Sequence, residues 1–174
     1  NPLNISLGNP NLQPYFNHNA RLGFGYTNRE TFTSLRASFS GGMVQGAITN
    51  AQWYDAAGAQ YSMPVNGPGT MNANAMIMIN SPIGRSNFSI MSMTNARYNQ
   101  STAYIGTDAF QSDKYYNAQT AEFDYDTFHD DFPNLNDTPA FTRNNTISAG
   151  FMEMLRLTYR NDVIELVAGG RTNM

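Results

Sequence analysis

The feature that most constrains this sequence is an alternation of apolar and polar residues, with a period of two, along most of its length. Such alternation predicts β-strands with one apolar and one polar face, here about six of them, and no convincing amphipathic helix is evident. The apolar rows comprise Ala20, Leu22, Phe24 and Tyr26; Leu35, Ala37 and Phe39; Met71, Ala73, Ala75, Ile77 and Ile79; Phe88, Ile90, Ala96 and Tyr98; Ile147, Ala149, Phe151, Leu155, Leu157 and Tyr159; and Ile164, Leu166 and Ala168.

The composition indicates a wall with one apolar face and not an ordinary globule. Charged residues make up 13% of the chain, about half the usual share of a soluble domain. The net charge is −3 and Lys114 is the only lysine, so nucleic-acid binding has little electrostatic support. The absence of cysteine excludes thiolate chemistry and disulfides. No apolar run is long enough for a transmembrane helix, but the strands of a membrane barrel need none.

The connections between the predicted strands alternate in length. Short ones cover residues 27–31, 81–86 and 161–162, and long ones cover residues 49–69 and 105–142. Outer-membrane barrels have this asymmetry, with short periplasmic turns and long extracellular loops. The sequence therefore predicts an all-β fold, an antiparallel up-and-down transmembrane β-barrel segment. The first long connection is expected to contain its own hairpin, in which residues 53–58 turn back into residues 60–63.

Strand register follows from closing the short turns on a common apolar face. This closure pairs Tyr159 with Ile164, Ile79 with Phe88 and Tyr26 with Thr33, and it places Met76 opposite Met91. Glu153 is the cleanest misfit, because it lies on the apolar row. A β-bulge near Met152 could turn its side chain inward, or the carboxylate could lie near the lipid headgroups.

Several segments resemble a known family. Residues 8–14 read GNPNLQP and are similar to the NPNLKPE signature of TonB-dependent receptors, with Gln13 in place of Lys and Tyr15 in place of Glu. Residues 53–66 and 155–162 resemble a loop and a strand–turn of the outer-membrane β-barrel family of Bacteroidetes type. The resemblance covers nearly the whole chain in order.

The resemblance implies part of the barrel of a receptor that binds and imports a nutrient, with 22 strands in the whole barrel and a plugged lumen. Its partners would be outer-membrane lipid, the receptor's own plug domain, an energy-coupling inner-membrane protein and, in some receptors, a surface lipoprotein. Residues 1–174 would form one partial barrel domain, and both ends look cut from a longer chain.

Two groups of residues are candidates for function. Aromatic residues in the long connections are expected to contact ligand, since loop aromatics often do so; they are Trp53, Tyr54, Tyr61, Tyr115, Tyr116 and Tyr125. The row opposite the apolar one is expected to face the lumen and plug. Its members of interest are Met76, Met78, Met91, Met93, Met152, Met154, Arg21, Arg36, Arg97 and Arg156.

The roles of the lumen row stay open at this point. The methionines either pack against a plug or form an apolar strip that contacts cargo, and packing is favoured because Met fills irregular gaps. The arginines either bind plug carboxylates or an anionic cargo, or are simply solvated.

No catalytic or metal site is expected. The acidic stretch from Glu122 to Asp131 does not have the spacing of a calcium loop, and a solvated loop is the favoured interpretation. His18 and His129 are the only histidines and form no paired-ligand spacing. We therefore expect no enzyme activity, no cofactor and no metal.

Two rival hypotheses belong to other functional classes. A structural or adhesive outer-membrane barrel without transport would need no plug contacts. A soluble all-β ligand-binding module would bury its apolar rows against each other and carry a conventionally charged outer face. The low charge content disfavours the soluble module.

Overall fold

The computed structural model describes residues 4–117 and 119–174, so Asn1 to Leu3 and Ala118 lie outside the described residues. The chain divides into two units. A loop unit contains residues 1–17, 44–70 and 100–146, and a wall unit contains residues 18–43, 71–99 and 147–174. Several strands run from one unit into the other, and each unit is considered by itself.

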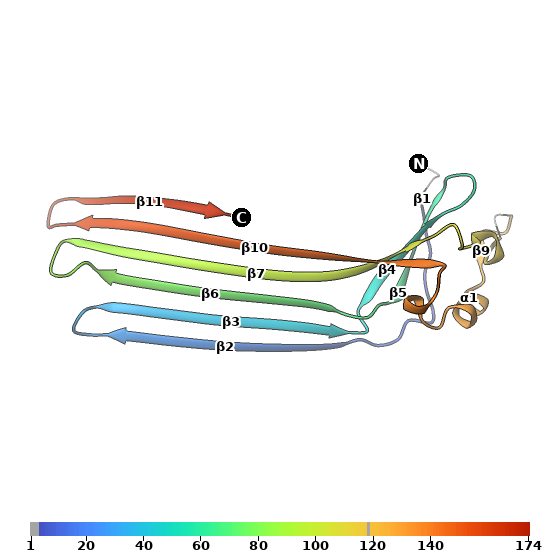
Figure 1. Cartoon of the computed structure of the whole chain (residues 1–174), viewed down its shortest axis with the longest axis horizontal. Coiled ribbons are helices and arrows are strands. Elements are labelled where there is room, and N and C mark those ends of the chain that lie inside the picture. The colour runs from blue at the N-terminus through green and yellow to red at the C-terminus, as the bar shows by residue number, and fades with distance from the viewer. Residues whose placement is uncertain (1–3, 118) are drawn as a thin grey trace. The chain divides into compact units, whose positions relative to one another are not determined.

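The wall unit is a sheet built from six long strands. They are β2 (Phe16–Asn28), β3 (Thr33–Gln45), β6 (Thr70–Pro82), β7 (Phe88–Gly106), β10 (Phe141–Arg160) and β11 (Glu165–Asn173). Their order in the sheet is β2, β3, β6, β7, β10, β11, so each strand pairs with the next long strand in the chain (Figure 1). This up-and-down arrangement confirms the predicted fold class, although the sheet is not closed among the described residues.

The apolar row of the wall unit is exposed. Relative exposure is 70% for Leu22, 47% for Ile77 and 50% for Leu155. All the buried core side chains among the described residues belong to the loop unit. The apolar rows are therefore not buried against each other, as a soluble module would require.

At the turn between β10 and β11 the predicted partners were wrong by two residues, but the predicted face of each side chain was right. Tyr159 pairs with Leu166 and not with Ile164, because the turn contains four residues. Asn161 Oδ1 accepts from the backbone N–H groups of Val163 and Ile164, at 2.9 and 2.7 Å, and so holds this longer turn. A shift of two residues keeps each side chain on its face.

The turn between β6 and β7 also differs from the prediction, which paired Ile79 with Phe88. Ile83 N donates to Phe88 O at 2.8 Å, so Phe88 does not pair with Ile79. Asn95, and not Met91, lies beside this part of β6, since its side-chain amide donates to Ala75 O at 3.3 Å. The predicted Met76–Met91 pair was therefore wrong.

The loop unit contains the predicted hairpin in a longer form. β4 (Ile48–Tyr54) and β5 (Gln60–Asn66) are antiparallel, with Trp53 opposite Tyr61. β1 (Asn4–Ser6) adds to β5 in parallel, and β4 pairs in parallel with the end of β7. These parallel pairs were not predicted.

The long connection after β7 folds over this hairpin. It contains η1 (Ser112–Lys114), the two-stranded sheet of β8 (Tyr116–Asn117) and β9 (Glu122–Phe123), α1 (Tyr125–Asp131) and η2 (Leu135–Asp137). The prediction that the chain has no convincing amphipathic helix was wrong at α1. Asp124 caps this helix, and Phe128 and Phe132, four positions apart, turn toward one core. Aspartate followed by apolar residues at helical spacing was the available signal.

Trp53 lies at the centre of the loop-unit core, with 1% of its surface exposed. Its ring lies parallel to that of Tyr61 at 5.8 Å between centroids and edge-on to that of Phe110 at 5.1 Å. Gly106 passes so close that a Cβ there would lie 2.6 Å from Trp53 Cβ. The aromatic residues of the loops therefore build a folded unit.

The helices of the described residues include no candidate for a membrane span.

Candidate ligand-binding groove in the loop unit

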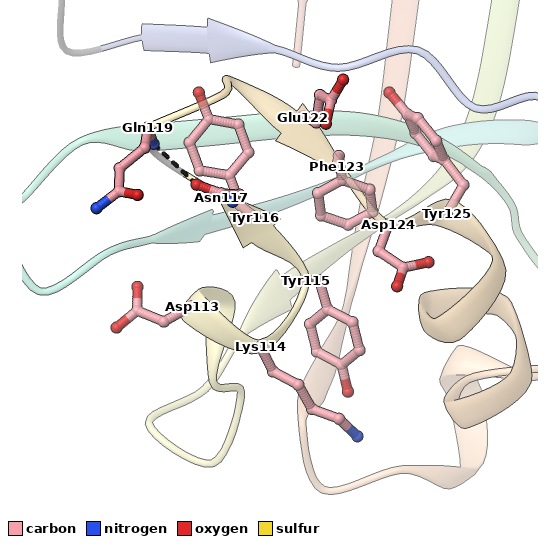
Figure 2. Close-up of a pocket in the computed structure, with 10 residues that line it drawn as sticks. All are labelled: Asp113, Lys114, Tyr115, Tyr116, Asn117, Gln119, Glu122, Phe123, Asp124 and Tyr125. Atoms are coloured by element: carbon pink, nitrogen blue, oxygen red, sulfur yellow. Dashed lines mark hydrogen bonds between the residues drawn. The ribbon is translucent and has the colours of Figure 1, made fainter.

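An open groove of about 1000 Å³ lies where η1, β8, β9 and the start of α1 meet. Figure 2 shows its lining, in which the phenol rings of Tyr116 and Tyr125 stand on either side of Phe123. Phe123 is buried, whereas Tyr116 and Tyr125 are half-buried. The core thus fixes the groove floor and leaves two phenol groups partly free.

The first turn of α1 is fixed by its cap. Asp124 Oδ1 accepts from Thr127 N at 3.0 Å, and Thr127 Oγ1 donates to Asp124 Oδ2 at 2.7 Å. The hydrogen bond from the Thr127 backbone, with that from its hydroxyl, lowers the pKa of Asp124. Both oxygens of this carboxylate are therefore engaged in capping α1, which begins at Tyr125 on the groove edge.

The far end of α1 is fastened to η1 by Asp131. Its Oδ2 accepts from Lys114 Nζ at 2.5 Å and from Tyr115 OH at 2.7 Å. The hydrogen bond from Lys114 lowers the pKa of Asp131, and the same bond raises the pKa of Lys114. Burial, followed by the hydrogen bond to Asp131, raises the pKa of the Tyr115 phenol.

This fastening should make the loop unit sensitive to acid. A carboxyl whose pKa is lowered by folding contributes stability that is present above its ordinary pKa of 3.8 and is lost as the pH falls through the lowered value. We expect protease cleavage within residues 107–140 to accelerate over that acidic range. Asp131→Asn should make cleavage fast at neutral pH and nearly independent of pH there. An unchanged acid profile in Asp131→Asn would show that another group controls this unit.

Two carboxylates of the groove remain available. Asp113 and Glu122 are exposed, and neither has a Lys, Arg or His partner within ion-pair distance in the described part of the chain. An ionised carboxylate is an acceptor only, and Tyr faces favour cations. The groove therefore suits a ligand that is rich in hydrogen-bond donors, neutral or cationic.

The structure divides the six predicted ligand-contacting aromatics. Trp53, Tyr61 and Tyr115 are core residues, so their side chains pack inside the unit and offer little surface to a ligand. Burial, with nearby Asp55, raises the pKa of Tyr61 to about 12. For Tyr116 and Tyr125 in the groove, and for Tyr54 in a neighbouring open groove with Asp55 and Asp108, ligand contact stays a prediction.

Metal ligands and histidines are not brought together. Among residues 4–117 and 119–174, no three His, Asp or Glu side chains are placed to hold a metal ion. His18 lies on β2, and His129 on α1 lines a small pocket of about 130 Å³ beside Asn9, Asn66 and Asn134.

The signature-like segment at residues 8–14 has a structural role in the loop unit. Asn9 Nδ2 donates to Pro64 O at 2.9 Å, Gln13 N donates to Asn66 Oδ1 at 2.8 Å, and Asn66 Nδ2 donates to Gln13 O at 2.9 Å. The segment is thereby tied to the end of β5.

The predicted lumen row lies on the wall strands. Its six methionines, Met76, Met78, Met91, Met93, Met152 and Met154, are half-buried, and Arg21, Arg36, Arg97 and Arg156 are exposed. None of these arginines has a carboxylate within ion-pair distance among the described residues. Whether the row faces a plug stays a prediction.

Sequence reasoning missed Arg171 as a member of this row. It lies opposite Met154 on β11 and lines, with Arg97, Asn95 and Asn173, a depression of about 70 Å³. The alternation of β11 up to Asn173 was the signal that could have found it.

No curated protein and no solved structure shows a significant match to this chain. A family model described as the outer membrane protein beta-barrel family matches residues 1–162. That match covers all but the last part of the described chain and agrees with the alternating, up-and-down wall. The chain therefore belongs to the outer membrane protein beta-barrel family and is a protein of the bacterial outer membrane.

Proposed function

We propose that this chain forms part of the barrel of a TonB-dependent receptor that binds a nutrient at the cell surface and imports it. The observation that carries the binding step is the preformed groove of the loop unit, with its half-buried Tyr116 and Tyr125 and with Asp113 and Glu122, which form no ion pair within the described residues. The import step rests on the resemblance of residues 8–14 to the receptor signature.

The wall supports a larger barrel. β2 and β11 each pair on one side only among the described residues, and hydrocarbon does not tolerate unpaired strand edges. Closed barrels of this class have at least eight strands. Further strands are therefore expected to pair with β2 and β11.

Energy-dependent uptake is the decisive test. Radiolabelled nutrients too large for diffusion pores would be offered to cells that carry or lack the intact gene, with and without a protonophore. We expect one nutrient to bind in both conditions and to accumulate only in energised cells that carry the gene. Surface binding without accumulation would favour the adhesive barrel instead.

The groove makes a specific prediction for that nutrient. Replacing Asp113 with Asn and Glu122 with Gln together removes both available charges and leaves the core intact. Hydrogen bonds to charged groups contribute about 1.5–3 kcal/mol each, so surface binding should weaken about tenfold or more. The control is Asp126→Asn, since Asp126 is exposed on α1 and does not line the groove. Equal binding by both variants would place the ligand elsewhere.

A further inference from the structure

The wall unit carries a polar cluster in the middle of its apolar row. Glu153 Oε1 accepts from Ser92 Oγ at 2.7 Å, and Glu153 Oε2 accepts from the hydroxyl of Thr94. Pairing along β10 and β11 is continuous from Met152 to Arg160, so no bulge rotates Glu153 to the other face. The suggestion of a β-bulge near Met152 was therefore wrong.

The neighbours of Glu153 along its row of β10 are apolar. Phe151 and Leu155 flank Glu153 on β10, with 40% and 50% of their surfaces exposed. Thr172 lies directly opposite Glu153 on β11. Both strands that pair with β10 are present, so no missing strand is needed to complete this surface.

The depth of the cluster follows from the strand. Tyr159 lies beside Phe88, with ring centroids 4.9 Å apart, and the exposed pair Arg160–Glu165 follows at once. Aromatic residues next to charged turns mark the membrane boundary. Glu153 lies six positions before Tyr159. At about 3.3 Å per residue and a tilt near 45°, this is about 14 Å into an apolar band of about 25 Å.

The atoms of this cluster that remain free for a ligand are hydrogen-bond acceptors. Both hydroxyls donate to the carboxyl group, so the ionised form offers only lone pairs, on its two oxygens and on the hydroxyls, together with its negative charge. An ionisable residue inside a membrane is costly and usually pairs with another polar group. A lipid amine stays near the headgroups and does not lie at this depth.

We propose that the Glu153 carboxylate, held by Ser92 and Thr94, is a docking site within the membrane for a guanidinium or ammonium side chain of a neighbouring membrane protein. Charge complementarity selects the occupant, because an acceptor-only anion is matched by a cation that carries N–H donors. The site lies on the apolar row, which is the lipid-facing row of an outer-membrane barrel, so its residues differ from those of the groove and of the predicted lumen row.

The chemistry can be tested on the whole purified barrel in a non-ionic detergent. The probes are dodecylguanidinium and dodecyltrimethylammonium, two amphiphilic cations of which only the first has N–H donors. We expect dodecylguanidinium to raise the unfolding temperature at lower concentration than dodecyltrimethylammonium. Glu153→Gln should remove this difference, whereas Glu165→Gln, a charge loss at the turn, should keep it. Equal effects of both probes on the unmodified barrel would overturn the proposal.

A second variant separates docking from a purely structural role. Ser92→Ala combined with Thr94→Val removes the hydrogen bonds from these two side chains of β7 to Glu153 and leaves the carboxylate and the strand pairing in place. Docking predicts that this variant keeps its preference for dodecylguanidinium. Loss of that preference, as in Glu153→Gln, would show that the cluster only fastens the strands.

The partner can be sought in cells with a photoreactive residue at Ala96, on the same face of β7. We expect a cross-linked product whose partner peptide contains Arg or Lys next to the linked position, and at least a tenfold loss of that product in Glu153→Gln. Cross-links to lipid alone, or to a protein whose yield is unchanged in Glu153→Gln, would overturn the proposal.

Discussion

Replacing Trp53 with alanine is expected to unfold the loop unit while the wall strands stay assembled. Trp53 contacts the rings of Tyr61, Phe110, Phe123, Phe128 and Phe141, with centroid distances from 5.1 to 6.5 Å. Truncation of a buried tryptophan costs about 3–5 kcal/mol, because apolar contacts are lost and a cavity remains. A unit built around one ring has little stability in reserve against that loss.

Hydrogen exchange measures this effect in the intact protein. Backbone amides of β4 and β5 should lose their protection in Trp53→Ala, and those of β10 near Leu155 should keep it. Tyr54→Ala is the matched control, because Tyr54 is 63% exposed and a surface change there should stay within about 0.5 kcal/mol. Protected β4 and β5 amides in Trp53→Ala would show that the core does not depend on this ring.

The wall could be predicted from the sequence because a period of two determines both the element and the face. Phe24, Ile77 and Leu155 each belong to a row of apolar residues spaced two positions apart, and each lies on an exposed strand face. The exact strand partners could not be predicted from this pattern. Parity is encoded in the pattern, but the length of a turn depends on local hydrogen bonds such as those of Asn161.

The loop unit was harder to predict, for a different physical reason. Tyr115 is far in sequence from Trp53 and Tyr61, and aromatic residues in long loops look alike whether they bind ligands or form a core. Only tertiary contacts distinguish these roles, and here they assign all three to packing. The groove residues Asp113 and Glu122 carry no sequence signature, because their role depends on which nearby carboxylates, such as Asp131, are already paired.

Placing an arginine on the exposed apolar row should prevent assembly in the outer membrane, and Phe39→Arg tests this at the middle of β3. Phe39 is 47% exposed and lies six positions from Thr33, where β3 leaves its short turn, a depth similar to that of Glu153, seven positions from the end of β10 at Arg160. Arginine on the lipid face costs about 2–4 kcal/mol near the midplane. It is also distant in sheet order from the Glu153 carboxylate, since β6 and β7 lie between β3 and β10.

The matched control is Ser40→Arg, one residue away on the opposite row, which already carries Arg36. Heat-modifiable migration of the outer-membrane fraction would report folded barrel in each variant. We expect Phe39→Arg to lose most of its folded band and Ser40→Arg to retain it, because only the first places a cation in hydrocarbon. Equal loss in both variants would mean that the two rows do not separate lipid from lumen. Loss in Ser40→Arg alone would reverse the assignment of the faces, and would place Glu153 with its two hydroxyl partners inside the barrel.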